Sequence, residues 1–356
     1  MKSAKHIAKL LVPFRWRRKI HEQFVSMRVH HLYGLKRIRL APNEAIVTCV
    51  VRNGEFYIEQ FIKHYTEMGF RHIFFLDNGS SDRTLAIARK YSNVSVCQST
   101  LPIDAYQLFL KRYLARHSSE GGWCLDADID EFFDYPMSDA MGLSTFLDYL
   151  NQNGYQAVMT QLLDMFPEKL LSDLAEEGSE DIKNTYQYYD LSEIRKTIYG
   201  WEEISATYGN ANQLANPGAE LCWGGIRKTL YGNDCLLTKH SLFSVANGIE
   251  PFTHVHFVNN ARLADISCVM RHYKLTSSAL SATLQNKERF STNSKPYGDF
   301  IDFLTSKPNY QFKKETAVKW RNAKDLVDRG FLFSSGAYHD FVAARTEDRV
   351  SRSAVQ

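Results

Sequence analysis

Residues 121–136 read GGWCLDADIDEFFDYP, an apolar β-prone run that passes directly into an acidic one. Five carboxylates fall within nine positions, namely Asp126, Asp128, Asp130, Glu131 and Asp134. Carboxylates crowded together repel one another, so burying them is costly unless a positive partner joins the cluster. The stretch therefore predicts a strand whose end lies beside a positively charged partner of the carboxylates.

The segments before this stretch alternate between strand-like and helical patterns. Apolar β-rich runs occur at EAIVTCVVRN (44–53), RHIFFLDNGSSD (71–82) and VSVCQ (94–98), and helical spacing occurs in 54–70, 81–92 and 104–118. This alternation predicts βαβ units, and hence an α/β fold with a mostly parallel sheet flanked by helices. Ligands of such sheets bind beyond the carboxyl ends of the strands, where residues 52–53, 77–82 and the acidic stretch all fall.

Composition supports a large folded body. The chain has 356 residues, of which 44% are hydrophobic, enough for one large domain with additions. Its six cysteines form no C-x-x-C pair, so the pattern indicates neither a zinc site nor a disulfide framework, and a reducing cytoplasm is expected. No stretch approaches the roughly 20 apolar residues of a membrane span.

Charge is unevenly distributed along the chain. The net charge is +3, but residues 1–42 carry eleven Lys or Arg against one acid, Glu22. Such a basic leader favours contact with an anionic membrane surface, so a peripheral position at the inner face of the membrane is one expectation. A solvated N-terminal helix is the alternative. The remainder of the chain is mildly acidic, which argues against nucleic-acid binding.

The spacing of the acids suggests which cation the cluster takes. Asp126, Asp128 and Asp130 alternate with a period of two, so they share one side if the strand continues through them. A divalent ion such as Mg²⁺ or Mn²⁺ accepts oxygen ligands and keeps open positions for substrate phosphates. The alternative is that these carboxylates cap a helix and face water.

Four ordered segments carry a resemblance to a known family. They are Trp123 with Asp128-Ile129-Asp130-Glu131-Phe132, VVRNGEFYIEQFIKHYTEMGF (50–70), FFLDNGSSDRT (74–84), and GGIRKTLYG (224–232) with RHYKL (271–275). The chain resembles family 2-type glycosyltransferases of the GT-A (nucleotide-diphospho-sugar transferase) fold, in particular the bacterial branch with a D-x-D-E-F motif. The resemblance covers roughly residues 44–275. It departs from the family pattern at Gly54, which is inserted between Asn53 and Glu55.

The resemblance implies a function and an architecture. The function is a metal-dependent, inverting glycosyltransferase that moves a sugar from a nucleotide-sugar donor to a glycan or lipid-linked acceptor, in surface polysaccharide synthesis. The architecture is a basic leader (1–42), a GT-A domain (43–280) and a helical C-terminal extension (281–356). Within the domain, residues 165–220 are an insert and a candidate acceptor region.

The resemblance also implies roles for individual residues. The metal ion is assigned to Asp128, Asp130 and His272, with His254 and His256 as rivals of His272 and with Asp126 as support from deeper in the strand. Nucleotide contacts are assigned to Asn53, Asp77, Asn78 and Asp82, although Asp82 is also placed to cap the following helix. Arg227 and Lys228 are assigned to the departing diphosphate. For the catalytic acids, Asp130 acts with the metal, and the general base is left open between Glu131, Glu220 and Asp234.

Two other functions compete with the transferase. A phosphatase of the haloacid dehalogenase type also needs an apolar strand followed by Asp-x-Asp. That motif normally opens its domain, whereas here two βα units precede it. A non-catalytic nucleotide- or glycan-binding protein on the same fold is the other alternative, because a fold does not determine a function.

Overall fold

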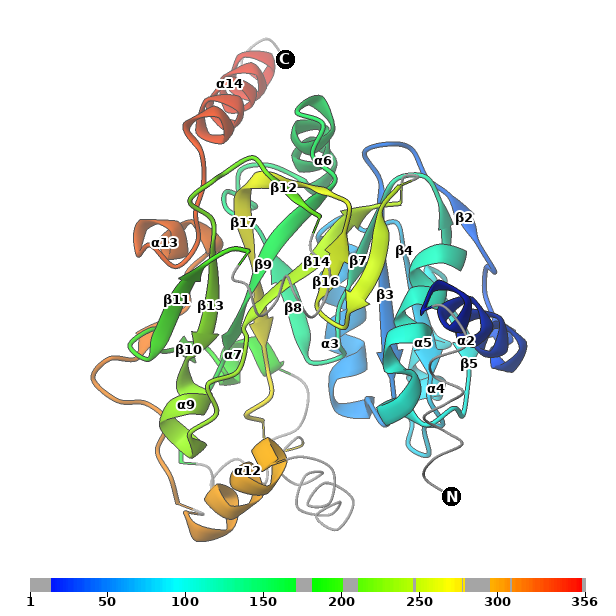
Figure 1. The fold of residues 1–356 in the computed structure, drawn as a ribbon. Helices are drawn as coiled ribbons and strands as arrows, with labels where there is room; N and C mark the ends of the chain where they lie inside the picture. Colours follow the sequence, from blue (N-terminus) through cyan, green and yellow to red (C-terminus); the bar gives the residue numbers. More distant parts are fainter. Residues whose placement is uncertain are drawn as a thin grey trace.

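The computed structural model describes residues 14–353 apart from 171–180, 201–210, 246–247, 277, 279–294 and 308. Within these residues, one ten-stranded mixed sheet forms the centre of an α/β fold (Figure 1). Its strand order is β1-β5-β4-β3-β7-β14-β9-β17-β12, with β8 paired to β17. The strands are β1 (His30–Tyr33), β3 (Ala45–Val51), β4 (His72–Asp77), β5 (Val94–Gln98), β7 (Trp123–Asp126), β8 (Glu131–Asp134), β9 (Ala157–Asp164), β12 (Gln213–Leu214), β14 (Thr238–Ser244) and β17 (Arg262–His272).

Smaller elements surround this sheet. The short strands are β2 (Ile38–Arg39), β6 (Ser119–Glu120), β10 (Tyr188–Tyr189), β11 (Ile194–Ile198), β13 (Glu220–Gly224), β15 (Glu250–His254), β16 (Phe257–Asn259) and β18 (Val318–Lys319). The helices are α2 (Phe14–Arg28), α3 (Glu55–Glu67), α4 (Thr84–Ala88), α5 (Ile103–His117), α6 (Leu143–Gln152), α7 (Ile182–Thr185), α9 (Ile226–Tyr231), α12 (Lys295–Ser306), α13 (Ala323–Asp328) and α14 (Gly336–Ser353).

Helices cover both faces of the first half of the sheet. Alternate residues of β3 point to opposite faces. Val47 and Cys49 pack in one apolar cluster with residues of α3, whereas Ile46 packs in a second cluster with residues of α5. Because both faces are covered, β3 and β4 are apolar almost throughout, as expected for buried parallel strands.

The parallel strands bring their carboxyl ends to one edge of the sheet. β3, β4 and β5 are parallel and in register, with Val51 opposite Asp77 and Asp77 opposite Gln98. β7 is parallel to β3, with Asp126 opposite Thr48. The polar residues that follow these strands are therefore neighbours at one rim, as the alternation of strands and helices predicts.

The second half of the sheet is mixed. β14 is antiparallel to both β7 and β9, while β17 runs parallel to β9 and antiparallel to β8. In this register His272 at the end of β17 lies opposite Glu131 on one side and Asp164 on the other. Five of the nine pairings in the described sheet are parallel, so the sheet is mixed but mostly parallel.

The acidic stretch differs from the expected continuous strand. β7 ends at Asp126, residues 127–130 form the connection, and β8 begins at Glu131. The three aspartates therefore do not share one face of a strand. The backbone turns because β8 must pair with β17 rather than continue beside β3. The turn points the aspartates at different partners.

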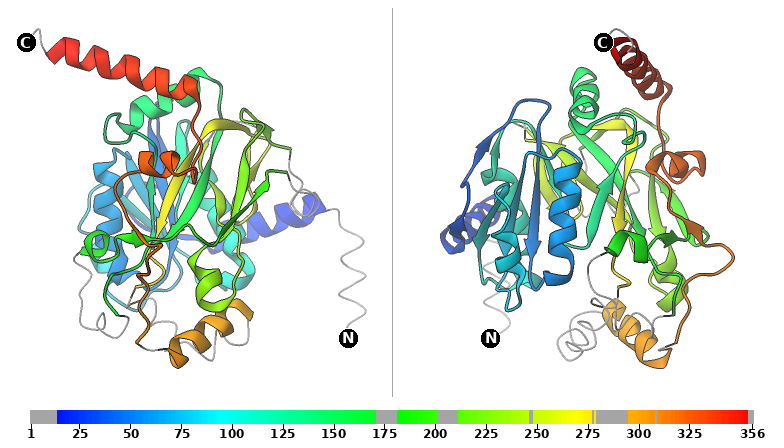
Figure 2. Two further views of the ribbon diagram at one scale, coloured as in Figure 1. Left: turned by 90° about the vertical axis from the view of Figure 1, so that its left-hand side faces the viewer. Right: turned by 180° about the vertical axis from the view of Figure 1, so that it is seen from behind.

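The two ends of the described chain are helical. Helix α2 packs on α5, where Glu22 accepts hydrogen bonds from Arg18, Arg112 and Arg116. Near the other end lie α12, α13 and α14, and α14 projects from the body (Figure 2). None of the described helices combines the length and apolar character needed to cross a membrane. The division at residues 42 and 280 stays a prediction, and parts of the leader, insert and extension lie outside the described residues.

Gly122, directly before β7, lies in a closely packed part of the backbone. Its φ is +65°, and a Cβ there lies 2.6 Å from the Glu44 carbonyl oxygen and 2.6 Å from Leu40 Cβ. Gly232 has a similar φ of +72° but no atom within 4 Å of a built Cβ. We expect Gly232→Ala to lower the free energy of unfolding by about 1 kcal/mol, the cost of the left-handed backbone. Gly122→Ala should cost about 2 kcal/mol more, because backbone atoms must shift.

Urea unfolding of both variants measures this difference. Equal losses in the two variants would mean that the entry to β7 relaxes freely, and would contradict the close packing of Gly122.

Candidate active site

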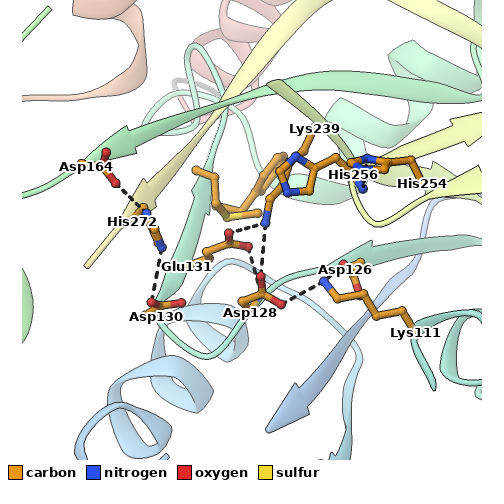
Figure 3. Close-up of polar contacts among 12 residues, drawn as sticks. Lys111, Asp126, Asp128, Asp130, Glu131, Asp164, Lys239, His254, His256 and His272 are labelled. Atoms are coloured by element: carbon orange, nitrogen blue, oxygen red, sulfur yellow. Dashed lines mark hydrogen bonds and ion pairs between the residues drawn. The ribbon is translucent and has the colours of Figure 1, made fainter. Parts of the chain in front are cut away.

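Two buried lysines neutralise much of the acidic cluster (Figure 3). Lys111 comes from α5, and its Nζ donates to Asp126 Oδ2 at 2.8 Å and to Asp128 Oδ1 at 2.9 Å. Lys239 comes from β14, and its Nζ donates to Asp128 Oδ2 at 3.3 Å and to Glu131 Oε1. Part of the positive charge that the acidic stretch requires is therefore supplied by the chain itself.

These contacts set the charge of the aspartates. Burial disfavours a charged Asp128, but the adjacent Lys111 and Lys239 outweigh it and hold its pKa well below the usual range. Burial dominates at Asp126 and raises its pKa to about 6, although Lys111 opposes this. Lys111 has a pKa well above its ordinary value, because the neighbouring carboxylates outweigh the burial that would lower it. Asp128 is thus an ionised carboxylate held between two ammonium groups.

Glu131 is a buried link in this network. Its side chain is 2% exposed, and its carboxylate accepts from Lys239 Nζ and, at 2.9 Å, from the backbone N–H of Asp128. The second contact closes the turn that carries Asp128. Both oxygens of Glu131 are therefore engaged in holding the turn, and this position gives little access to an acceptor hydroxyl.

A second chain of contacts begins at Asp130. His272 Nε2 lies 3.3 Å from Asp130 Oδ2, and His272 Nδ1 lies 2.6 Å from Asp164 Oδ1. Arg227 Nε donates to the other oxygen of Asp164 at 2.7 Å. Burial lowers the tendency of His272 to be charged, but Asp130 and Asp164 outweigh it and raise its pKa to about 9. The four residues come from the β7–β8 turn, β17, β9 and α9.

Asp130 and His272 fit the requirements of a divalent ion. The carboxylate of Asp130 faces Nε2 of the imidazole, while Asp164 orients the ring through Nδ1, which is the usual support of a metal-binding histidine. Among the described residues, no group of three or more His, Cys, Asp or Glu side chains is arranged to hold a metal ion. Mg²⁺ is commonly held by only one or two carboxylates together with waters and substrate phosphates, so a site with few protein ligands is chemically feasible. Asp128 is less available, since each of its oxygens accepts from a lysine.

His254 and His256 lie on the opposite side of Lys239 from His272 (Figure 3). The two rings are 5.4 Å apart, between centroids, and His256 stands in the turn after β15. Burial, with the nearby Lys239, holds the pKa of His256 well below its usual range. These histidines thus lie near Lys239, whereas His272 faces Asp130.

The residues predicted for the nucleotide brace two adjoining loops. Asp77 accepts from the backbone N–H groups of Gly79 and Ser80, and Asn78 donates to the carbonyl oxygens of Ser99 and Leu101. Asn53 has a φ of +53° and accepts from the Ser81 N–H at 2.8 Å. Asp82 accepts from the N–H of Glu55 at the start of α3 and from Thr84 at the start of α4, although the N-cap residue of α4 is Arg83.

The remaining predicted residues are separated by the fold. Arg227 is buried beside Asp164, while Lys228 is partly exposed and lies 3.7 Å from Glu193. Glu220 in β13 pairs with Lys196 at 3.3 Å, and its side chain is 44% exposed. Asp234 pairs with Arg195 at 2.9 Å and is also partly exposed. Only Arg227 of this group has a contact with the Asp130–His272 chain.

Sequence reasoning missed Lys111, Lys239 and Asp164. Asp164 ends an apolar run, AVMTQLLD (157–164), just as Asp77 and Asp126 end theirs, so the same strand-end signal was present. Lys239 stands within a buried strand, TKHSLFS (238–244), where a lysine requires a partner. Lys111 lies among apolar residues of α5. Lysines on amphipathic helices are common, so the sequence gives little indication that this one is buried beside the acids.

Comparison with known proteins finds a distant structural likeness. No protein-family model matches the chain, and no curated protein matches it either. Among solved structures, it is similar to the mannosyltransferase PcManGT from Pyrobaculum calidifontis in complex with GDP-Man and Mn²⁺. The match has 19% identity and a TM-score of 0.26, and it covers 45% of this chain and 44% of the other. A likeness this low does not establish a shared fold or function.

The lysine network allows a test of stability. Lys239→Met leaves Glu131 and Asp128 without this buried cation, so we expect the free energy of unfolding to fall by about 3 kcal/mol or more. Lys228→Met removes a partly exposed lysine and should cost less than about 1 kcal/mol. Chemical denaturation of the two variants gives both values. Similar small losses in both would show that Lys239 is not the charge partner of the acidic cluster.

Proposed function

We propose that the chain is a metal-dependent glycosyltransferase of the GT-A type that uses a nucleotide-sugar donor. The observation that carries this proposal is the pair of Asp130 and His272, oriented by Asp164 at the rim where the parallel strands end. Ligands of open α/β sheets bind at this rim. The family resemblance of the D-x-D-E-F, nucleotide-loop and R-H-Y-K-L segments supports the same reading.

The charges of the two contact chains, counted together, support a divalent ion. Three cationic side chains, Lys111, Arg227 and Lys239, are paired with carboxylates. The carboxylates of the two chains number five, namely Asp126, Asp128, Asp130, Glu131 and Asp164. The raised pKa of His272 favours its protonated form, which leaves one negative charge. Loss of that proton leaves two negative charges, which is the charge that one Mg²⁺ or Mn²⁺ offsets. Asp130 and His272 would hold the ion, and when bound it would stabilise the charge on a leaving diphosphate.

Arg227 is proposed to bind the donor diphosphate. Its Nε is engaged with Asp164, which fixes the plane of the guanidinium group, while its Nη2 is buried and has no hydrogen-bond partner among the described residues. A guanidinium N–H of this kind is well suited to a phosphate oxygen. The loops braced by Asn53, Asp77, Asn78 and Asp82 are proposed to bind the nucleoside through the surface they shape.

The proposed reaction is a single displacement with inversion at the anomeric carbon. An oxygen of the acceptor hydroxyl forms a bond to this carbon, while the bond from the carbon to the diphosphate oxygen breaks. A general base takes the hydroxyl proton, and the nucleoside diphosphate leaves with the bonding electrons. Lys111 and Lys239 keep Asp128 ionised and fixed beside the reacting groups.

The general base is proposed to be Glu220 or Asp234. Glu131 is engaged through both oxygens, whereas the side chains of Glu220 and Asp234 are 44% and 39% exposed. Glu220 is the first residue of β13, which pairs with β11 of the 165–220 insert, and Asp234 lies 2.9 Å from Arg195 of β11. We therefore propose that the acceptor, a glycan or lipid-linked saccharide, binds beside this strand pair.

The first prediction concerns donor binding. Titration of nucleotide sugars into the full chain should give binding with Mn²⁺ and none with EDTA for at least one donor. Asp130→Asn and His272→Ala should each weaken that binding at least tenfold, because each removes a ligand of the ion. Asp164→Asn should lower the affinity for the metal ion by about tenfold or more, because Asp164 orients the ring of His272. Asp139→Asn changes an exposed aspartate that contacts Asn322, so it serves as the control and should bind normally.

The same experiment separates the alternatives. Binding with neither transfer nor slow donor hydrolysis would favour the non-catalytic binding protein. Release of phosphate from p-nitrophenyl phosphate, abolished in Asp126→Asn, would favour the phosphatase. If no donor binds with or without metal, and all variants behave alike, the transferase proposal fails.

A second prediction assigns the base. For a donor that is hydrolysed or transferred, Glu220→Gln or Asp234→Asn should lower kcat by a factor of about 100 or more, with donor affinity unchanged. The acid that gives this result is the base, and the other serves as the matched control. Normal kcat in both variants would exclude the pair.

A further inference from the structure

An exposed apolar surface lies at the basic N-terminal edge of the fold. Five large hydrophobic side chains are exposed in the described part of the chain, and four of them fall within residues 20–35: Ile20, Met27, Leu32 and Leu35, the fifth being Ile198. Helix α2 lies at the periphery of the molecule in all three views, and β1 follows it directly (Figures 1 and 2). We call the outer surface of residues 19–39 the basic edge.

Helix α2 has two different faces. Val25 is fully buried, and Glu22 is turned inward to Arg18, Arg112 and Arg116. Ile20 and Met27 are seven residues apart, two helical turns, so they lie on one face, and both are largely exposed. The inner contacts hold the helix in place and leave this outer apolar face toward solvent.

Positive charge accompanies the exposed apolar groups. Lys19, Arg28, Lys36, Arg37 and Arg39 are all exposed. The single acid between residues 14 and 39 is Glu22, which is already paired with arginines. Lys19 and Lys36 have no acidic partner in the described part of the chain. Arg39 lies 3.8 Å from Glu120, and both side chains are largely exposed. The basic edge therefore combines apolar side chains with an excess of cations over acids, which is the composition that binds an anionic lipid surface.

A pocket adjoins this edge. It has a volume of about 290 Å³, and the residues that line it include His31, Leu35, Lys36, Tyr113 and His117. Its lining contains imidazole and ammonium groups but no carboxylate. A pocket of this chemistry suits an anionic group such as a lipid phosphate, and it opens beside the apolar residue Leu35.

We propose that the basic edge is a docking surface for an anionic phospholipid bilayer. Ile20, Met27, Leu32 and Leu35 enter the boundary between headgroups and acyl chains, while Lys19, Lys36 and the neighbouring arginines contact lipid phosphates. The charge complementarity identifies a bilayer rather than a second copy of the chain, because two copies of this edge would bring like charges together. The inference stands independently of the transferase proposal.

Vesicle co-sedimentation of the full chain tests this inference. We expect binding to phosphatidylcholine vesicles that contain about 30 mol% phosphatidylglycerol, little binding to phosphatidylcholine alone, and weakening as salt rises toward about 0.5 M. Met27→Ser/Leu35→Ser should weaken binding at least tenfold without changing the net charge. Ile198→Ser is the matched apolar control, because Ile198 is 73% exposed and Met27 is 70% exposed. It should bind like the original chain.

The charge contribution has its own control. Lys19→Gln/Lys36→Gln should weaken binding about 25-fold, at about fivefold per charge. Lys63→Gln/Lys324→Gln has the same net charge but changes lysines that are paired with Glu59 and Asp328, and it should bind normally. Equal losses in the two lysine pairs, or no loss in Met27→Ser/Leu35→Ser, would reduce the interaction to general charge attraction and overturn the proposal.

Two further outcomes would also overturn it. One is equal binding to neutral vesicles, and the other is a dimer in light scattering that Met27→Ser/Leu35→Ser dissociates. Donor titrations on the same variants distinguish this inference from the proposed activity. The variants expected to lose vesicle binding, Met27→Ser/Leu35→Ser and Lys19→Gln/Lys36→Gln, should bind the donor normally. Asp130→Asn should bind vesicles normally.

Discussion

The candidate site depends on the electrostatic compensation of an acidic turn. Asp126, Asp128, Asp130 and Glu131 lie within six positions, and most of their surface is removed from water. Uncompensated, this arrangement would be strongly unfavourable, since a buried charge without a partner costs several kcal/mol. Lys111 approaches from one helix and Lys239 from a strand on the other side, and Asp128 lies between them. The turn can therefore exist only where α5 and β14 meet the end of β7.

This compensation divides the acids into two groups with different chemistry. Asp126, Asp128 and Glu131 are engaged with lysines and keep the turn in one conformation. Asp130 faces a histidine instead, and that histidine is supported by Asp164 and, through it, by Arg227. A proton or a metal ion can compensate the charge of Asp130. The charges of Asp126, Asp128 and Glu131 are instead compensated by lysine side chains, which are fixed parts of the chain. The exchangeable charge of the cluster is thus concentrated at the Asp130–His272 pair, and this concentration makes the pair the centre of the proposed donor site.

The sheet topology makes this pair possible. β17 lies between β8 and β9, and its last residue, His272, stands opposite Glu131 and Asp164. A shift of β17 by one residue would turn the imidazole to the other face of the sheet. The basic edge is built differently, because α2 is attached to α5 through Glu22 and Arg112, and the strand that follows it, β1, is the first in the strand order. The proposed donor site and the proposed bilayer surface therefore lie at different places in the fold and are both attached to the helix α5.

The amino-acid sequence by itself determined the α/β class, the parallel strands β3, β4, β5 and β7, and the meeting of their polar ends at one rim. These features follow from short-range patterns: apolar runs, helical spacing and strand-end acids such as Asp77 and Asp126. The expectation of one continuous acidic strand was wrong, because the pairing of β8 with β17 decides where β7 ends. Only the tertiary structure decided that Lys111 and Lys239 flank Asp128, and that Asp164, 108 residues before His272, orients its ring. Local sequence cannot encode these choices, since they depend on which distant strands and helices come together.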